Sequence, residues 1–491
     1  MPMQQRRTKI IATLGPATDP PDVLEALIEA GADVLRLNLS HGPAEEQRRR
    51  ASQAREAAER VGREIAILAD LEGPKIRIGS FPDGAIQLKS GERFTIRAGD
   101  EATAGDQHGV GASYENLHRD VQPGQVLLLD DGLISMRVDD IDGRSVHCEV
   151  INGGLLGSRK GINLQGGGLS IPGIAESDIR QIPLVAEMDV DYLAVSFPRN
   201  ADDMHQARRL LREAGCDAGL VAKIERAEAI RNLESIIDAS DAVLVARGDL
   251  GVEIGDAELP GLQKRIIRRA LRQNRIVITA TQMMQSMVEN PIPTRAEVLD
   301  VANAVIDGTD AVMLSAETAV GKHPVRVIEA MNRVCLGAER HCDSSEDVQQ
   351  LNVRFERIDQ AIAMAAMYTA TKVSVQAIVA LTESGSTAQW LSRVRTSVPI
   401  YALSARAASR RRMALFRDVY PVSHVQQWGS LDKEIRRALQ MLVENGRLSP
   451  GDRVILTSGD ALGNEGGTNT LRLLQVGPDG MVEHHSELDL R

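Results

Sequence analysis

The segment LVAKIERAEAI places a lysine and a glutamate, Lys223 and Glu225, two residues apart in a short apolar run. Side chains at this spacing point to the same face of a β strand. With Asp249 on a neighbouring strand, Glu225 can offer Mg²⁺ a second hard oxygen ligand, and proteins commonly hold this ion by one or two carboxylates. The plainer alternative is an ion pair between Lys223 and Glu225 that stabilises the edge of the fold.

Phosphoryl transfer needs positive charge around the moving group, because negative charge spreads over its equatorial oxygens. Lys223, a Mg²⁺ ion and Arg36, which lies in another apolar run, would supply that charge without covalent catalysis. The sequence has neither the GxSxG turn of serine hydrolases nor the GxxxxGK[ST] loop of P-loop enzymes. Phosphoryl transfer therefore fits these residues better than acyl transfer.

Similar polar clusters close six apolar runs along the chain. A solvated strand end explains any one of them equally well, but six coinciding clusters argue against that explanation. If the strands form a closed parallel barrel, their carboxyl ends meet at one mouth. The clusters are Arg36, Asn38, Ser40 and His41; Asp70; Lys223 and Glu225; Arg247, Gly248 and Asp249; Thr279 and Thr281; and Ser315 and Glu317.

The elements that must position these clusters alternate between short apolar runs and amphipathic stretches, which is typical of βα units. Eight strands predict an α/β fold built on a closed (β/α)₈ TIM barrel, with an open doubly wound sheet as the alternative. They are predicted near residues 9–14, 34–37, 65–69, 192–196, 220–224, 242–245, 276–279 and 311–314.

Between the third strand and the following helix, the pattern changes to alternating segments such as RFTIRAG, separated by Gly, Asp and Pro, which predicts an all-β insert. The polar stretch HCDSSEDVQQ precedes a further α/β segment, with strands near 377–381, 399–403, 419–422 and 454–457. We therefore expect a barrel over residues 1–72 and 160–343, a β domain over 73–159 and a C-terminal α/β domain over 344–491.

Composition limits the classes of partner. Fifty-seven Lys and Arg against 68 Asp and Glu give a net charge of −11, which argues against nucleic acid or an anionic membrane as the main partner. The N-terminal residues lack the apolar core of a signal peptide, and no apolar run reaches the length of a membrane span. The four cysteines show no CxxC spacing, so a reducing, cytoplasmic location is expected.

Nine segments of the chain together resemble the pyruvate kinases in order and separation: TKIIATLGPAT, RLNLSHG, DLEGPKIR, KGINL, AKIERAEAI, VARGDLGVEI, TATQMMQSM, PTRAEVLDVANAV and MLSAETAVGKHP. The resemblance covers nearly the whole chain. It implies transfer of the phosphoryl group of phosphoenolpyruvate to ADP, giving pyruvate and ATP in the last step of glycolysis, with Mg²⁺ or alternatively Mn²⁺. It also implies a catalytic barrel, a β lid and a C-terminal effector domain in a homotetramer.

The resemblance assigns roles to the clusters. Glu225 and Asp249 would hold Mg²⁺, and Arg36 and Lys223 would bind the phosphoryl group. The proton donor to the enolate stays open, because a threonine hydroxyl is too weak an acid without a relay through water. The remaining implied groups are Ala246, Arg247 and Gly248 with Asp249 and Thr281 at the substrate; Thr281, Ser315 and Glu317 at the enolate; and Asn38, His41, Arg77 and Lys160 at the nucleotide.

Lys75 departs from a common family pattern, in which a glutamate accompanies a potassium ion. That ion would lie at Asn38, Ser40, Asp70 and the carbonyl of Leu71. An ammonium at this place can supply the missing positive charge, so activity without potassium is expected. The alternative is a solvent-facing lid lysine. A second departure, Gln165 in place of proline, is expected to have a local effect.

In the C-terminal segment, LTESGSTAQW places Thr382, Ser384, Ser386 and Thr387 between a strand and a helix start, where a phosphate can be bound. An N-cap and turn is an equal alternative. In family members activated by a sugar bisphosphate, the last loop brings basic or aromatic groups, whereas here it brings Asp460. Glu465 lies in the same loop, so a monophosphorylated effector, a sugar phosphate or a nucleotide, is expected.

Two other functions compete with this interpretation. A barrel lyase or aldolase acting on pyruvate-like enolates would use the same carboxylates, but carbon–carbon chemistry does not need the clamp of Arg36 and Lys223. A catalytically dead nucleotide-binding regulator would be favoured by the loss of Lys223, Glu225 or Asp249, and all three are present.

Overall fold

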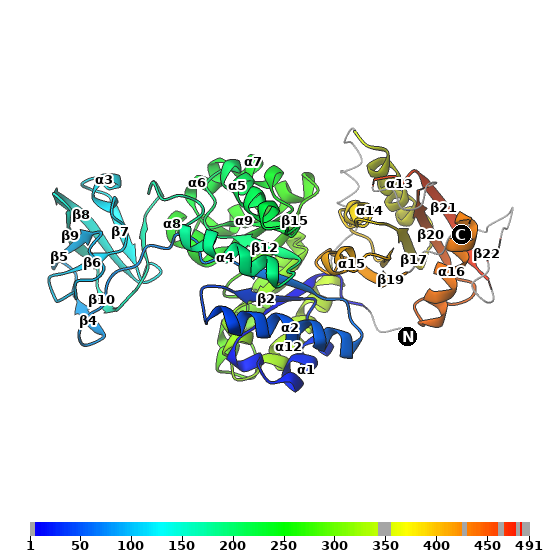
Figure 1. Cartoon of the computed structure of the whole chain (residues 1–491), viewed down its shortest axis with the longest axis horizontal. Helices are drawn as coiled ribbons and strands as arrows, with labels where there is room; N and C mark the ends of the chain where they lie inside the picture. Colours follow the sequence, from blue (N-terminus) through cyan, green and yellow to red (C-terminus); the bar gives the residue numbers. More distant parts are fainter. Residues whose placement is uncertain (1–4, 342–354, 425–429, 460–465, 478–481, 484–491) are drawn as a thin grey trace.

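The computed structural model describes residues 5–341, 355–424, 430–459, 466–477 and 482–483. Three bodies follow one another along its longest axis, with a β domain at one end, a barrel in the middle and an α/β domain at the other end (Figure 1). The chain enters the barrel, leaves it for the β domain after β3, and returns to complete the barrel before it reaches the C-terminal domain.

The central body is a closed barrel of eight parallel strands in the order β1-β16-β15-β14-β13-β12-β3-β2. This confirms the predicted barrel, and the open sheet is wrong. All eight strands fall where the apolar runs predicted them. Their bounds are β1 Lys9–Thr13, β2 Val34–Asn38, β3 Ala66–Asp70, β12 Tyr192–Val195, β13 Gly219–Ile224, β14 Ala242–Ala246, β15 Ile276–Ala280 and β16 Ala311–Leu314.

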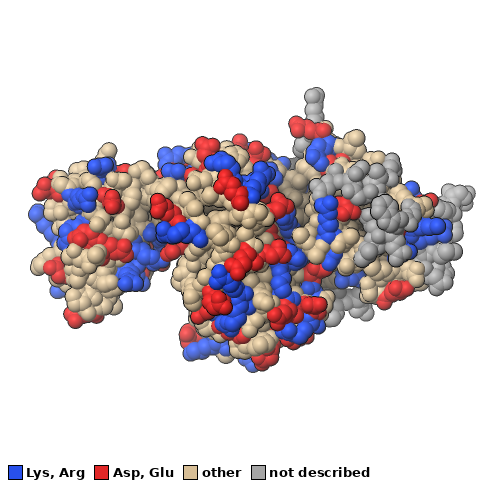
Figure 2. All heavy atoms as spheres, viewed as in Figure 1, with Lys and Arg blue, Asp and Glu red and all other residues tan. Residues whose placement is uncertain are grey.

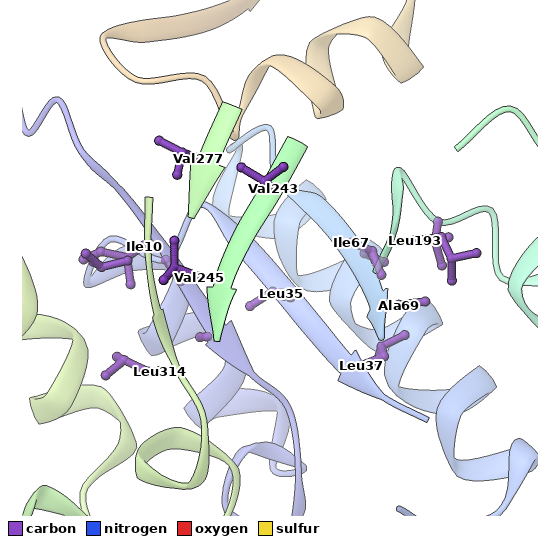
Figure 3. Close-up of a cluster of buried hydrophobic side chains, with 14 of the residues drawn as sticks. Ile10, Leu35, Leu37, Ile67, Ala69, Leu193, Val243, Val245, Val277 and Leu314 are labelled. Atoms are coloured by element: carbon purple, nitrogen blue, oxygen red, sulfur yellow. The ribbon is translucent and has the colours of Figure 1, made fainter. Parts of the chain in front are cut away.

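Successive side chains along each barrel strand alternate between two apolar layers, one outside the barrel and one inside it. Residues such as Leu35, Leu37 and Val243 point outward and pack against the surrounding helices (Figure 3). Their neighbours, such as Val34 and Leu244, belong to the inner layer. Because successive side chains on a strand alternate between faces, the polar residues in phase with the inner layer reach the mouth of the barrel.

The helices that surround the barrel bury one face each. Thr294 begins α10 by accepting a hydrogen bond from the Glu297 amide, and Gly308 ends it with φ of 103°, which favours glycine. The helices are α1 Pro21–Glu29, α2 Ala44–Val61, α4 Glu176–Glu187, α5 Ala201–Glu213, α6 Ala227–Arg231, α7 Leu233–Ala239, α8 Arg247–Ile254, α9 Leu259–Arg272, α10 Arg295–Asp307, α11 Ala316–Ala319 and α12 Pro324–Glu339, with 3₁₀ turns η1 Pro16–Thr18 and η2 Gln285–Val288.

The β domain inserted after β3 consists of a six-stranded sheet, β11-β7-β8-β9-β5-β6, and a two-stranded sheet, β10-β4. The sheet continues beyond the expected limit at residue 159, because β11 pairs antiparallel with β7. One short helix, α3 Leu117–Asp120, accompanies the strands. The strands are β4 Ala85–Leu88, β5 Arg93–Ala98, β6 Gly109–Ala112, β7 Val126–Leu129, β8 Ile134–Asp142, β9 Ser145–Asn152, β10 Gly154–Gly157 and β11 Ile162–Leu164.

The C-terminal domain has one sheet in the order β19-β18-β17-β20-β21-β22, flanked by helices. Its first four strands fall where the sequence predicted them and are parallel, and β21 and β22 add an antiparallel edge that the sequence patterns did not predict. The expected domain limit at 343–344 lies outside the described residues. The elements are α13 Ile358–Lys372, β17 Ala377–Leu381, α14 Ser386–Leu391, β18 Ile400–Ser404, α15 Ala407–Met413, β19 Val419–Ser423, α16 Leu431–Glu444, β20 Arg453–Ser458, β21 Thr470–Val476 and β22 Val482–Glu483.

Candidate active site

Arg36 and Asp70 form a buried ion pair across two neighbouring strands at the mouth of the barrel. β2 and β3 are parallel, and the inward-facing side of each carries one of the two residues. Arg36 donates from Nε to Asp70 Oδ2 at 2.7 Å, and its Nη2 lies 2.7 Å from the same oxygen. Nη1 donates to Thr13 Oγ1 at 3.0 Å, which brings the end of β1 into the same cluster.

Lys223 joins this pair to Glu225. Its Nζ donates to Ser196 Oγ at 2.7 Å and lies 3.3 Å from Asp70 Oδ1 and 3.0 Å from Glu225 Oε1. Glu225 Oε2 accepts a hydrogen bond from the Phe197 amide at 2.9 Å, and Phe197 has φ of 58°. The ammonium is therefore held by groups from three strand ends, and its side chain is 13% exposed.

The charges at the mouth shift one another's pKa values. Burial lowers the pKa of Lys223, but Asp70 and Glu225 outweigh burial and raise it above the ordinary value. Burial raises the pKa of Asp70, but the charges of Lys223 and Arg36 outweigh burial and lower the pKa below its ordinary value. Asp70 therefore stays ionised. Burial raises the pKa of Glu225 to about 6, with Asp249 and Asp70 adding to the rise against the effect of Lys223.

Glu225 and Asp249 are the acids of this cluster that fit a divalent cation. Asp249 lies in the first turn of α8, its side chain is 25% exposed, and its charge acts on both Glu225 and Lys223. The described residues contain no group of three or more His, Cys, Asp and Glu side chains that could hold a metal by themselves. A two-carboxylate donor set fits Mg²⁺, which takes its other oxygens from substrate and water.

Thr281 holds the turn from β14 into α8 through a hydrogen bond to its backbone. The Gly248 amide donates to Thr281 Oγ1 at 2.9 Å, and Thr281 Oγ1 donates to the Ala280 carbonyl at 2.7 Å. Thr281 has φ of 66°, a left-handed conformation that costs a non-glycine residue energy. The side chain of Arg247 points to the turn after β15, with Nη2 donating to the Thr281 carbonyl at 2.6 Å and Nη1 2.6 Å from Asp300 Oδ1.

Glu317 is buried behind the turn that follows β16. Its Oε1 accepts from the Met284 amide at 3.1 Å, and its Oε2 accepts from the Ser315 amide at 2.7 Å. The carboxylate thus ties the loop after β15 to the start of α11. Both oxygens of Glu317 therefore accept hydrogen bonds from backbone amides.

The residues expected to bind nucleotide lie in two groups. Asn38 Oδ1 accepts from the Ser40 amide at 3.2 Å, and the neighbouring His41 is exposed. On the β domain, Arg77 Nη2 lies 3.6 Å from Glu72 Oε1, and Lys160 Nζ lies 2.8 Å from Asp130 Oδ1. The first group belongs to the barrel and the second to the β domain.

Lys75 does not join the groups expected around a monovalent cation. Its Nζ lies 3.4 Å from Asp249 Oδ1 and 3.9 Å from Asp131 Oδ1. Asp70 instead pairs with Arg36 and Lys223, and the Leu71 carbonyl accepts from Ser196 Oγ at 2.8 Å. The structure therefore places the Lys75 ammonium beside an expected Mg²⁺ ligand.

Comparisons with known proteins agree with this architecture. A family model described as pyruvate kinase, barrel domain, matches residues 5–328, and one described as pyruvate kinase, alpha/beta domain, matches residues 360–474. The chain belongs to the pyruvate kinase family. It is similar to pyruvate kinase II of Salmonella typhimurium, with 51% identity over 97% of this chain and 100% of that protein.

Two further relatives extend the likeness within the family. The pyruvate kinase of Haemophilus influenzae is 48% identical over 97% of this chain and 100% of its own length. That of Geobacillus stearothermophilus is 40% identical over 96% of this chain and 80% of its own length. Neither the lyase or aldolase nor the inactive regulator finds support in these matches.

The region expected to bind an effector forms a compact turn at the start of α14. The Gly385 amide donates to Thr382 Oγ1 at 3.0 Å, and Thr387 Oγ1 lies 2.7 Å from Thr468 Oγ1. Ser386 Oγ lies 3.4 Å from Asp359 Oδ2. Ser384 lies within this turn, between Thr382 and Gly385, and Asp460 and Glu465 lie outside the described residues.

Two strand ends contribute residues that the sequence patterns missed. Ser196 follows β12 and contacts Lys223, and Thr13 ends β1 and contacts Arg36. Both are polar residues at the end of a buried strand, the same signal that identified the other clusters. Their small hydroxyl side chains make that signal weak, since serine and threonine are common in ordinary turns.

No helix in the described part of the chain combines the length and apolar character needed to cross a membrane. On the face shown in Figure 2, basic and acidic side chains intermix over the barrel and the β domain. Cys148, Cys216 and Cys335 carry free thiols, and Cys342 lies outside the described residues.

Proposed function

We propose that the chain transfers the phosphoryl group of phosphoenolpyruvate to ADP, giving pyruvate and ATP. The observation that carries this proposal is the contact chain Arg36–Asp70–Lys223–Glu225, which gathers two cations and two acids from three barrel strands at one mouth. Such a cluster suits a reaction in which catalysis consists mainly of positioning and charge stabilisation.

Arg36 and Lys223 bind the phosphoryl group as it moves. Lys223 enters the reaction as a cation, because the neighbouring carboxylates raise its pKa. Asp70 orients both cations. Its carboxylate stays ionised, because their charges lower its pKa. The chain thus supplies a pre-formed electropositive site whose orientation costs little at the moment of transfer.

Glu225 and Asp249 hold Mg²⁺, with Mn²⁺ as an alternative ion. When bound, the metal supplies positive charge to substrate oxygens as a Lewis acid. The buried Glu225 carboxylate, whose pKa is raised by burial and by Asp249, is stabilised by an added cation. Asp249 is the more exposed of the two acids.

The turn after β14 receives the substrate carboxylate. Ala246 and Gly248 lie at the start of α8, where helix amides favour an anion, and the Gly248 amide exchanges its bond to Thr281 Oγ1 for one to the substrate carboxylate. Arg247 acts by holding this turn against β15, and Thr281 and Ser315 line the enolate face with Glu317 as a support. Asn38, His41, Arg77 and Lys160 meet the nucleotide when the lid approaches the barrel.

The deciding experiment is a coupled assay that follows pyruvate from phosphoenolpyruvate and ADP, with Mg²⁺ omitted in a parallel reaction. We expect turnover that requires both substrates and the metal. Asp249→Asn is a matched variant that keeps the size of the side chain and removes one metal ligand, so it should raise the Mg²⁺ requirement. Metal-independent turnover by the wild type would contradict the proposal.

We further propose that potassium is not required. Arg36 and Lys223 already neutralise Asp70, and Lys75 adds a third cation at Asp249. The wild type should turn over fully in buffers made with tetramethylammonium salts. Lys75→Glu should become dependent on added potassium, and strong stimulation of the wild type by potassium would refute this assignment.

The C-terminal domain binds a monophosphorylated effector at Thr382, Ser384, Ser386 and Thr387, in a homotetramer located in the cytoplasm. Saturation curves for phosphoenolpyruvate with and without a sugar monophosphate or a nucleotide test the site, and Ser386→Ala should weaken the response. Tight activation by a sugar bisphosphate would count against it. Sedimentation measurements test the tetramer.

A further inference from the structure

Glu253 lies where the return segment of the lid, the chain that leads from β11 back to the barrel, meets the barrel. It is not among the residues assigned to the reaction. It is 6% exposed and lines a cavity between lid and barrel together with Lys75, Asn163, Phe197 and Arg226. The role assigned to the metal site does not use this residue. A buried carboxylate at such a joint needs partners, and its partners are informative.

The carboxylate of Glu253 holds the backbone just beyond Glu225. Its Oε2 accepts a hydrogen bond from the Ala227 amide at 2.8 Å. Ala227 begins α6 and follows Glu225 by two residues, so this bond fixes the chain on the far side of the first expected metal ligand. Hydrogen bonds of this kind to the surroundings of a ligand commonly set its orientation.

Glu253 is also attached to the second expected metal ligand. Asp249 precedes it by four residues on α8, so the two side chains lie on one face of the helix, one turn apart. Lys75 pairs with Asp249 and lines the same cavity as Glu253, which agrees with this placement. A single residue thus connects the segments that carry both carboxylates.

The same residue touches the lid. The Gly166 amide donates to the Glu253 carbonyl at 2.9 Å, at the start of three consecutive glycines whose φ angles are 83°, 75° and 112°. These angles suit glycine and mark Gly166 to Gly168 as a turn that other residues adopt at a cost. Two further bonds continue the attachment, from the Gly168 amide to Glu228 and from Arg226 Nη2 to the Leu169 carbonyl.

We propose that Glu253 is a positioning residue that fixes Glu225 and Asp249 relative to each other and couples both to the return segment of the lid. The inference rests on the metal site of the proposed function. It adds that the metal site and the attachment of the lid share one residue, whose carboxylate holds the Ala227 amide and whose carbonyl holds the Gly166 amide, so that loss of the carboxylate weakens metal binding.

The experiment measures Mn²⁺ binding to the full chain without substrate, by the loss of the free-ion signal in electron paramagnetic resonance. Glu253→Ala removes the acceptor of the Ala227 amide and should raise the Mn²⁺ dissociation constant by about tenfold or more. Glu253→Gln keeps an acceptor oxygen of the same reach and should stay within about threefold of the wild type. Asp256→Ala, an exposed acid just beyond α8, is the matched control and should change nothing.

Ala227→Pro provides a second test if Glu253→Ala does not fold. Proline is tolerated at the first position of a helix, and Arg226 before it is already extended, so the change removes the amide donor with little other strain. It should weaken Mn²⁺ binding as Glu253→Ala does. Folded Glu253→Ala or Ala227→Pro protein with wild-type Mn²⁺ affinity would overturn the inference.

Asp249→Asn separates this inference from the proposed function. If Asp249→Asn binds Mn²⁺ as the wild type does, the metal site itself is wrongly assigned and both proposals fall. If Asp249→Asn loses binding while folded Glu253→Ala keeps it, the metal site stands and the positioning role of Glu253 fails. Loss in both, with the glutamine variant near wild type, supports the role of Glu253.

Discussion

The two ends of the barrel both bury ionic side chains, yet they differ in what those charges meet. At the mouth, Arg36, Asp70, Lys223 and Glu225 contact one another, and Asp249 raises the pKa of Glu225. At the base, where the barrel strands begin, Asp310 and Asp191 meet arginines from the C-terminal domain, and Asp33 meets Arg6 and Arg63. The mouth thus keeps an acid next to Asp249 that an added cation would stabilise, whereas Asp310, Asp191 and Asp33 at the base are paired within the protein.

The base forms the junction between the barrel and the C-terminal domain. Arg393 Nη2 lies 2.5 Å from Asp310 Oδ1, and both side chains are almost fully buried. Arg411 Nε lies 2.7 Å from Asp191 Oδ1, and the other oxygen of Asp191 accepts from the Ile67 amide at 2.8 Å. One apolar cluster runs from the inner layer of the barrel into the C-terminal domain.

The difference teaches that residue type alone does not distinguish a reactive charge cluster from a structural one. In barrel enzymes the carboxyl ends of the strands carry the chemistry and the amino ends carry stability. Mutations at the mouth should therefore reduce turnover more than stability, and mutations at the base should do the reverse. Four experiments test this contrast, from the largest expected effect to the smallest.

Lys223→Met should reduce kcat by at least about 10²–10³-fold, because it removes a cation that stabilises the moving phosphoryl group. A coupled pyruvate assay measures the loss, and circular dichroism checks the fold. Lys264→Met, at a half-exposed lysine on α9, is the control and should keep wild-type turnover. Retention of more than about a tenth of the activity in Lys223→Met would remove the contrast.

Arg393→Met should destabilise the protein by about 3–5 kcal/mol, because it leaves the Asp310 carboxylate buried without its ion-pair partner. Urea unfolding measures the change. Turnover of the protein that stays folded should be unaffected, in contrast to Lys223→Met. Adding Asp310→Asn should recover part of the loss, since no unpaired charge then remains, and a loss below about 1 kcal/mol in the single variant would show that this pair contributes little.

Asp418→Asn tests the charge of the base through pH. Burial raises the pKa of Asp418 to about 6, while Arg417 and Arg7 lower it and Glu339 raises it, with Lys9 also facing it. A raised carboxyl pKa adds stability that is full below the unfolded pKa, near 4, and is lost as the pH rises through about 6. Relative to Asp418→Asn, the wild type should therefore lose about 3 kcal/mol between about pH 4 and pH 7.

Urea unfolding at several pH values measures that difference, and subtracting the variant cancels the titration of all other carboxyl groups. A difference between wild type and Asp418→Asn that does not change with pH would mean that Asp418 is not perturbed. Turnover measured at neutral pH should be similar for both proteins, because Asp418 lies at the base.

Asp217→Ala should have the smallest effect. Asp217 pairs with Arg412 of α15 at the rim of the base, 3.2 Å between Arg412 Nη2 and Asp217 Oδ2, but its side chain is 96% exposed. Exposed pairs add little to stability, so the melting temperature should change by less than about 1 °C. A larger change would extend the structural role of the base from its buried pairs to its rim.

The apolar runs were sufficient to predict the barrel. Each barrel strand is a short buried segment, and a side chain at a given parity along a strand must face either the core or the helices. That local rule also predicted Lys223 and Glu225 on one face, together with the clusters at Arg36 and Asp70. It missed Ser196 and Thr13, whose small polar side chains resemble those of any turn.

The sequence by itself determined which residues stand at the ends of the strands, because strand position and side-chain phase follow from local order. Only the tertiary structure decided their partners, which come from segments far apart in the chain. It moved Lys75 from the expected cation site to Asp249, directed Arg247 into the turn after β15, and closed the base with arginines of the C-terminal domain. Contacts between distant segments depend on how whole elements pack, and no local pattern records that.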